Sequence, residues 1–184
     1  FDDHASILGN PTIRALWPPG PILQPPVEAG VGGRPLANLT FALNHAISGV
    51  QPWSYHAANL GLHLASALLL FGCIRRTLLR LPRAPENPSV PAMVAATLWA
   101  VHPLGTAVVN YASQRTEALM ATCALLSLYA FIRALESPSR RWSVLSVAAC
   151  LLGAGAKETI VVVPVLLFWY DRAFGAGSWR AAWT

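Results

Sequence analysis

Charged residues are scarce in this chain of 184 residues, of which only 11% are Asp, Glu, Lys or Arg. Soluble domains carry about 25% charged residues. Hydrophobic residues make up 54% of this sequence instead. This composition excludes an ordinary soluble domain and is typical of a protein that lies largely within a lipid bilayer.

Cysteine is also rare, and its placement excludes two common uses. Cys73, Cys123 and Cys150 lie within apolar segments, and no CxxC pair is present. Isolated cysteines of odd number predict neither a disulfide framework nor a zinc site, so we interpret them as small buried hydrophobic residues. The sequence has no internal repeat and its charges lie at segment ends, which argues against a repeat-built transporter.

Most basic residues collect in three places beside the apolar segments. Nine of the thirteen lysines and arginines are there: Arg75, Arg76, Arg80, Arg83, Arg133, Arg140, Arg141, Arg172 and Arg180. By the positive-inside rule these three places are cytoplasmic. Because such residues set topology and face anionic lipid headgroups, they do not indicate nucleic-acid binding.

The opposite side of the membrane then holds nearly every residue that could carry chemistry. These residues are Asp2, Asp3, Arg34, His45, His56, His63, His102, Arg115, Glu117, Lys157 and Glu158. Ionisable groups at membrane depth are expensive and usually functional. We therefore expect an active or binding surface that faces the periplasm or an equivalent outer compartment.

Residues 1–52 are predicted to form a long outer loop, and residues 53–184 a transmembrane helical bundle. The loop holds eight of the fifteen prolines and six of the thirteen glycines, which prevent a continuous helix. A short interfacial helix is expected at 35–47, where four apolar residues recur at helical spacing. Because the chain starts on the outer side without a segment that could carry it across, we expect a preceding membrane helix in the complete protein.

Five apolar segments are candidates to cross the bilayer, for which about 20 helical residues suffice. They are 55–74, 91–110, 117–134, 142–156 and 159–170, and the last two are short. Five crossings from an outer start place the tail inside, in agreement with its arginines. We therefore predict an all-α membrane protein with about five transmembrane helices and a long first outer loop.

Asp2 and Asp3 form an adjacent acidic pair in the outer loop. A solvated pair of loop residues is the simplest interpretation. A carboxylate at a membrane interface can also act as a general base toward a hydroxyl or hold a divalent cation. The pair alone does not distinguish these roles.

Four polar residues of the first membrane helix, His56, Asn59, His63 and Ser66, are spaced 3, 4 and 3 residues apart. They therefore share one helical face. Such a stripe forms either a polar seam with neighbouring helices or part of a site. We expect it to point into the bundle. The two histidines lack the close spacing of a helical metal-ligand pair, so no metal site is assigned to them.

Two pairs of charged residues lie near the outer ends of the later segments. Arg115 and Glu117 are two residues apart and do not face each other on a helix, so each needs another partner, or extends to the interface. Lys157, which precedes Glu158, opposes the topological bias. A lone outer lysine suggests an anionic partner such as a phosphate.

Six ordered motifs resemble one family of membrane proteins. They are Arg34-Pro35-Leu36 with Leu39-Thr40 and Asn44; Trp53-Ser54-Tyr55-His56 with Asn59-Leu60 and His63; Val101-His102-Pro103-Leu104; Gln114-Arg115-Thr116-Glu117-Ala118-Leu119; Ala156-Lys157-Glu158; and Tyr170-Asp171-Arg172. In these motifs the chain resembles the membrane proteins with C-terminal tetratricopeptide repeats, which include bacterial members and the eukaryotic transmembrane O-mannosyltransferases. The membrane part of that family is similar to the GT-C glycosyltransferase superfamily.

The resemblance implies a GT-C-like fold, a polyprenyl- or dolichyl-phosphate sugar donor, and inverting attack by an acceptor hydroxyl. One carboxylate of Asp2 and Asp3 would be the catalytic base. Arg34, Arg115 and Lys157 would hold the donor phosphate. The other candidates would line one outer cavity: His56, His63, His102, Glu117 and Glu158. No metal ligand is assigned, and a divalent cation at the acidic pair stays open.

The expected partners are the lipid bilayer, the lipid-linked sugar, and a protein acceptor or a membrane-protein partner. The expected location is a bacterial inner membrane with the site facing the periplasm, and C-terminal repeats would lie beyond these 184 residues. Where family members often carry His-Pro-x-(His or Gln)-Thr-Glu, this chain has His102-Pro103-Leu104-Gly105-Thr106-Ala107. This departure favours the alternative function, a non-catalytic membrane scaffold that assembles with other membrane proteins.

Overall fold

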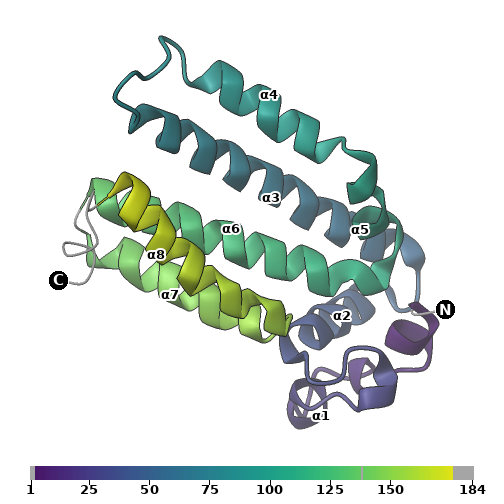
Figure 1. Ribbon diagram of the computed structural model, residues 1–184. Helices are drawn as coiled ribbons and strands as arrows, with labels where there is room; N and C mark the ends of the chain where they lie inside the picture. Colours follow the sequence, from purple (N-terminus) through teal and green to yellow (C-terminus); the bar gives the residue numbers. More distant parts are fainter. Residues whose placement is uncertain (1–2, 138, 176–184) are drawn as a thin grey trace.

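The computed structural model describes residues 3–137 and 139–175, and the regular elements within these ranges are all helical. The predicted all-α class is therefore confirmed. Asp2 and Arg180 lie outside the described residues. Five helices run side by side as a bundle (Figure 1): α3 (Pro52–Leu79), α4 (Ser89–Ala100), α6 (Arg115–Glu136), α7 (Arg140–Ala154) and α8 (Val163–Phe174).

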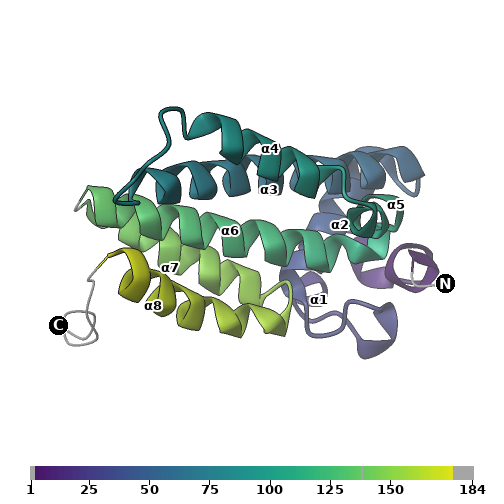
Figure 2. The same cartoon turned by 45° about the horizontal axis from the view of Figure 1, so that its top comes forward.

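The two ends of the bundle differ in chemistry. The arginine end, at the left of Figure 1, holds the connection between α3 and α4 and the connection between α6 and α7. The site end, at the right, holds residues 3–51, α5 (Thr106–Asn110) and the first turns of α6; Figure 2 shows the same grouping from a second direction. The candidate site residues therefore lie at the opposite end of the bundle from the arginine-rich connections.

Two helices are long and apolar enough to cross a membrane, Pro52–Leu79 and Ala112–Glu136. At about 1.5 Å per residue they exceed a hydrocarbon core of roughly 30 Å. Ser89–Ala100 and Pro103–Asn110 would together form a third span with a bend of 53°. Because α7 has 15 residues and α8 has 12, the five crossings remain a prediction.

The helix predicted at 91–110 is broken in its middle, so that prediction is wrong in its continuity. His102 is extended, with φ −64° and ψ 133°. A residue before proline avoids the helical conformation, and Pro103 lacks the N–H that would continue the helix. The chain therefore turns at this point and resumes as α5. The last predicted segment likewise begins with a 3₁₀ turn, Glu158–Val162, before α8.

Residues 3–51 include the short helix α1 (Gly20–Leu23) and the helix α2 (Pro35–Ser48). They pack around a small apolar core to which later parts of the chain contribute Tyr55, Ala112, Leu119 and Ala156. The side chains of this core that are almost completely buried include Ile13, Ile22, Val31 and Phe41. The Asn38 amide donates to the Ile22 carbonyl at 2.9 Å and accepts from Asn10 Nδ2 at 2.9 Å. Buried amides paired in this way tie irregular backbone to α2. The helix predicted at 35–47 is confirmed as α2.

Candidate functional site

The polar stripe of α3 faces the interior of the bundle, as its spacing predicts. Asn59 Nδ2 donates to the carbonyls of Val108 and Tyr111, at 3.0 Å each. Ser66 shares a hydrogen bond of 2.9 Å with Thr122 of α6. These contacts hold α5 and α6 against α3, so this part of the stripe is a polar seam between elements.

The two histidines of the stripe contact the broken segment that follows α4. His56 Nδ1 lies 3.1 Å from the Val109 carbonyl, and His63 Nε2 lies 2.8 Å from the Ala100 carbonyl. The His63 ring also stacks on Trp99, with centroids 5.0 Å apart. Each histidine therefore has one ring nitrogen fixed by a backbone carbonyl, which sets its orientation.

Arg115 is the most deeply buried charged side chain of the site end, with only 1% of its surface exposed. Its Nε donates to Asn59 Oδ1 at 2.8 Å, and its two terminal nitrogens donate to further acceptors on α2 and α3. Those acceptors are Asn44 Oδ1 and the carbonyls of Thr40 and Tyr55. The guanidinium also lies over the Phe41 ring, 4.6 Å from its centroid. Every nitrogen has a protein acceptor, so the geometry favours a positioning role over the predicted phosphate contact.

Asp3 contacts the 3₁₀ turn Ala112–Gln114, which immediately precedes α6 and lies more than one hundred residues away in the sequence. Its two carboxylate oxygens accept hydrogen bonds from the backbone N–H groups of Ala112, at 3.2 Å, and Ser113, at 2.7 Å. A carboxylate at a helix N-terminus satisfies backbone donors that have no partner within the helix. Asp3 also lines a cavity of about 200 Å³ together with His4 and His56. Its predicted partner Asp2 lies outside the described residues.

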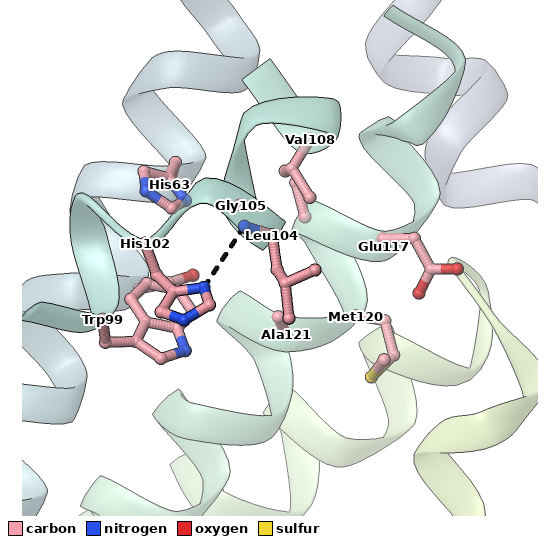
Figure 3. Close-up of a pocket in the computed structure, with 11 residues that line it drawn as sticks. His63, Trp99, His102, Leu104, Gly105, Val108, Glu117, Met120 and Ala121 are labelled. Atoms are coloured by element: carbon pink, nitrogen blue, oxygen red, sulfur yellow. Dashed lines mark hydrogen bonds between the residues drawn. The ribbon is translucent and has the colours of Figure 1, made fainter. Parts of the chain in front are cut away.

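A larger cavity of about 470 Å³ lies among α3, α4, α5 and α6. Figure 3 shows His63, Trp99 and His102 on one side of it and Glu117 with Met120 on the other. His102 is exposed, and its Nδ1 accepts a hydrogen bond of 3.2 Å from the Leu104 N–H (Figure 3). Most of the lining side chains are apolar, so this cavity suits a ligand with both an apolar and a polar part.

The outer lysine and its acidic neighbour connect three elements of the site end. Lys157 Nζ donates to Glu117 of α6, and Glu158 lies 4.0 Å from Arg34, which precedes α2. The Leu36 N–H also donates to the Gly155 carbonyl at 2.9 Å. Two of the three predicted phosphate-binding cations, Arg34 and Lys157, are thus present at this end and paired with carboxylates.

Several of the predicted site residues lie in two different cavities of this structure, and the expectation of one shared cavity stays a prediction. The smaller cavity contains Asp3 and His56, and the larger contains His63, His102 and Glu117. The division arises because the Asn59 amide pins the backbone around α5 to the middle of the stripe. Among the described residues, no group of three or more His, Cys, Asp or Glu side chains is placed to hold a metal ion.

Sequence reasoning missed two kinds of residue. Asn44 and Tyr55 hold the guanidinium of Arg115, and Asn44 shares the buried face of α2 with Phe41, a pattern that could have marked it as an inward polar residue. The second is Gly105, which replaces the polar residue that family members often carry at this position. Packing against His63 explains why a glycine is found there. A Cβ at this position would lie only 3.3 Å from His63 Cε1, so a small residue keeps the ring in place.

Comparisons with known proteins give consistent matches. The model of a family described as dolichyl-phosphate-mannose-protein mannosyltransferase matches residues 31–181. The protein O-mannosyl-transferase Tmtc1 of Drosophila melanogaster is 31% identical over 176 residues, which cover 90% of this chain and 19% of that protein. Human protein O-mannosyl-transferase TMTC4 is 30% identical over 89% of this chain and 25% of its own length. The chain thus spans about a quarter or less of these two relatives. No solved structure gives a significant match.

Proposed function

Because the chain belongs to the dolichyl-phosphate-mannose-protein mannosyltransferase family, we propose that it is the membrane portion of an O-glycosyltransferase that uses a lipid-phosphate sugar. Its family and its two long apolar helices make it an integral membrane protein. In the proposed reaction a mannose-like sugar passes from a polyprenyl phosphate to a hydroxyl of a protein acceptor. The proposed topology has five crossings, with the site end in the periplasm or lumen and the arginine end in the cytoplasm.

The observation that carries this proposal is the placement of Asp3. Its carboxylate is held just before α6 by two backbone N–H groups. The larger cavity lies at the same end of the bundle, with Glu117 in its lining and Lys157 bound to Glu117. A base and a phosphate-binding group must lie at the same end of the molecule for transfer to occur. Asp3 and Lys157 come from distant parts of the sequence to this same end of the bundle, which supports the proposal.

In the proposed step, the acceptor oxygen attacks C1 of the sugar as its proton passes to a carboxylate. The bond between C1 and the phosphate oxygen breaks, and the lipid phosphate leaves with its electron pair. Attack opposite to the leaving group inverts the configuration at C1. Because both oxygens of Asp3 already accept backbone hydrogen bonds, we assign the base to Asp2 and the fixing of the segment to Asp3.

Lys157 and Arg34 are the proposed contacts of the donor phosphate. A guanidinium and an ammonium group attract a phosphate strongly where water is partly excluded. Lys157 is bound to Glu117, which lines the larger cavity, so a phosphate there would share or replace this carboxylate. The apolar wall formed by Trp99, Leu104 and Met120 would contact the lipid chain. Arg115 would keep α2, α3 and α6 in register around it.

One further function is favoured by a specific observation. Both candidate phosphate-binding cations are paired with carboxylates, and Arg115 is fully occupied by protein acceptors. A non-catalytic membrane scaffold that assembles with other membrane proteins would need no vacant cation. The scaffold and the enzyme differ in one measurable property, which is sugar transfer from a lipid phosphate.

The test is transfer of radiolabelled sugar from a polyprenyl phosphate by the complete protein and by its Asp2→Asn and Asp3→Asn variants. Loss of a general base costs on the order of 10²–10⁴ in rate, so Asp2→Asn should bind the donor but transfer at least about a hundredfold more slowly. Asp3→Asn should lower transfer less, because an amide oxygen can still accept one backbone hydrogen bond. If both variants transfer at the parental rate, or the parent transfers nothing, the scaffold function replaces the enzyme.

A further inference from the structure

The arginine end of the bundle has an excess of positive charge where α3 and α6 meet. Arg75 and Arg76 lie in the last turns of α3, Arg80 directly follows that helix, and Arg133 lies in the last turn of α6. Among the described residues, the only carboxylate within ion-pair distance of these four guanidinium groups is that of Glu136, which pairs with Arg76 and lies 3.9 Å from Arg133 Nε. The four arginines and Glu136 therefore have a formal charge of about +3, which no other carboxylate of residues 3–137 and 139–175 balances within ion-pair distance.

A groove beside this cluster continues from charged to apolar. Its cavity of about 360 Å³ is lined by the following residues of α3 and α6: Leu68, Leu69, Phe71, Gly72, Arg75, Arg76 and Tyr129. Leu68 is 71% exposed. The groove thus has two guanidinium groups at one end and a leucine-rich wall that runs toward the middle of α3.

Gly72 gives the head of the groove its shape. A Cβ at Gly72 would lie 2.7 Å from Tyr129 Cε2, so only glycine allows the tyrosine ring to pack against α3. The Arg76 guanidinium in turn lies over that ring, 5.3 Å from its centroid. Stacking on an aromatic face fixes a guanidinium group. The edge of the Arg76 guanidinium pairs with Glu136, so a phosphate at this position would share Arg76 with that carboxylate.

Arg75 supplies the second cation of the groove. Its Nε donates to Ser89 Oγ at 3.0 Å, which is its one hydrogen-bond partner in the part of the chain that the structure describes. The Arg75 side chain is exposed, so its two terminal nitrogens are accessible to a ligand. The two terminal nitrogens of a guanidinium group match the spacing of two phosphate oxygens. Arg75 lies about 35 Å along α3 from its first residue, at about 1.5 Å per residue. This position is at headgroup level for a helix that crosses a core of roughly 30 Å.

From this geometry we propose that the groove binds one anionic phospholipid. The phosphate lies between Arg75 and Arg76, and an acyl chain lies along Leu68 and Leu69. The ligand is a membrane lipid rather than a free phosphate, because the apolar wall continues from the two cations toward the bilayer core. Basic pockets between transmembrane helices recognise anionic headgroups in this way. The site is at the opposite end of the bundle from the proposed sugar transfer and is independent of that proposal.

The experiment measures binding of fluorescent phosphatidylglycerol to the detergent-solubilised full-length protein, with phosphatidylcholine of the same acyl chains for comparison. Phosphatidylglycerol should bind at least about fivefold more tightly, and Arg75→Gln should weaken it about fivefold, as expected for one basic residue near an anionic headgroup. The matched control is Arg83→Gln, an exposed arginine outside the groove, which should change binding less than about twofold by the same reasoning. Unchanged thermal unfolding of both variants shows that they are folded.

Three results would overturn the proposal. If Arg83→Gln weakens phosphatidylglycerol binding as much as Arg75→Gln does, the attraction is diffuse and no groove is involved. If free glycerol phosphate displaces the lipid at a concentration similar to that at which the lipid itself binds, the site recognises the anion alone. If Arg75→Gln leaves the preference for phosphatidylglycerol unchanged, the phosphate does not lie at Arg75.

Discussion

Replacement of Arg115 by leucine is the perturbation whose magnitude follows most directly from the structure. The variant removes the donors that reach Asn44 Oδ1 and Asn59 Oδ1, and both asparagines are buried. The backbone carbonyls of Thr40 and Tyr55 lie within α2 and α3, where helical hydrogen bonds can still satisfy them. At about 1–3 kcal/mol for each buried acceptor left without a donor, the loss is about 2–6 kcal/mol in the free energy of unfolding.

The assay is thermal unfolding of the detergent-solubilised protein. For a chain of this size, about 2–6 kcal/mol corresponds to a lowering of Tm on the order of 10 °C. Arg115→Lys keeps the charge but presents a single ammonium group, so its free energy of unfolding should fall roughly half as much as that of Arg115→Leu. The matched control is Arg34→Leu, because the Arg34 side chain is 29% exposed and its ion pair with Glu158 is 4.0 Å long. The free energy of unfolding of that variant should fall by less than about 1 kcal/mol.

The result that would refute this reasoning is specific. If Arg115→Leu unfolds within about 2 °C of the parent, a shift that corresponds to less than about 1 kcal/mol, the guanidinium does not hold α2, α3 and α6 together. A simultaneous loss of donor binding would then support the phosphate contact that the sequence predicts for Arg115.

Three further predictions concern packing and topology. Gly153→Ala should lower the free energy of unfolding by about 1–3 kcal/mol, because its Cβ would overlap Ile160 Cδ1 and lie 2.9 Å from Cys123 Cβ. The control Gly61→Ala, which meets nothing within 4 Å, should be neutral or stabilising, and equal Tm values of the two variants would contradict the packing. Ser146→Ala should lower the free energy of unfolding by about 0.6 kcal/mol, because Ser127 and Ser146 exchange hydrogen bonds of 2.9 Å between α6 and α7. A double-mutant cycle with Ser127→Ala that shows no coupling energy would contradict this contact. A membrane-impermeant thiol reagent should label Glu28→Cys in intact cells and spare Pro85→Cys, and the reverse pattern would invert the proposed topology.

The helices were predictable because apolar length and helical spacing are local properties of the sequence. The helix observed at Pro35–Ser48 and those at Pro52–Leu79 and Arg115–Glu136 agree with the predicted segments to within a few residues. The break at His102 was not predicted, although Pro103 supplies the reason for it. The apolar residues on both sides of this proline conceal the break, because both halves lie in one hydrophobic run.

The arrangement of the site was less predictable, because its contacts join residues far apart in the sequence. The spacing of the α3 stripe identifies the face on which His56 and His63 lie, but it cannot show that Asn59 pins the backbone beside α5 between them. Arg115 likewise has a plausible membrane-interface position in the sequence. Its acceptors come from residues 56 to 75 positions earlier, and only the packing of α2 against α3 and α6 reveals its burial.

The central claim is that the site end receives a lipid-phosphate sugar, and photocrosslinking tests it most directly. A polyprenyl-phosphate sugar with a photoreactive group beside the phosphate would be bound to the complete protein, crosslinked, and mapped by mass spectrometry. We predict labelling of the larger cavity and its rim, at peptides that contain Trp99, Met120 or Lys157, and protection by an excess of the unmodified donor. Labelling confined to the arginine end, or labelling that the unmodified donor does not reduce, would contradict the account.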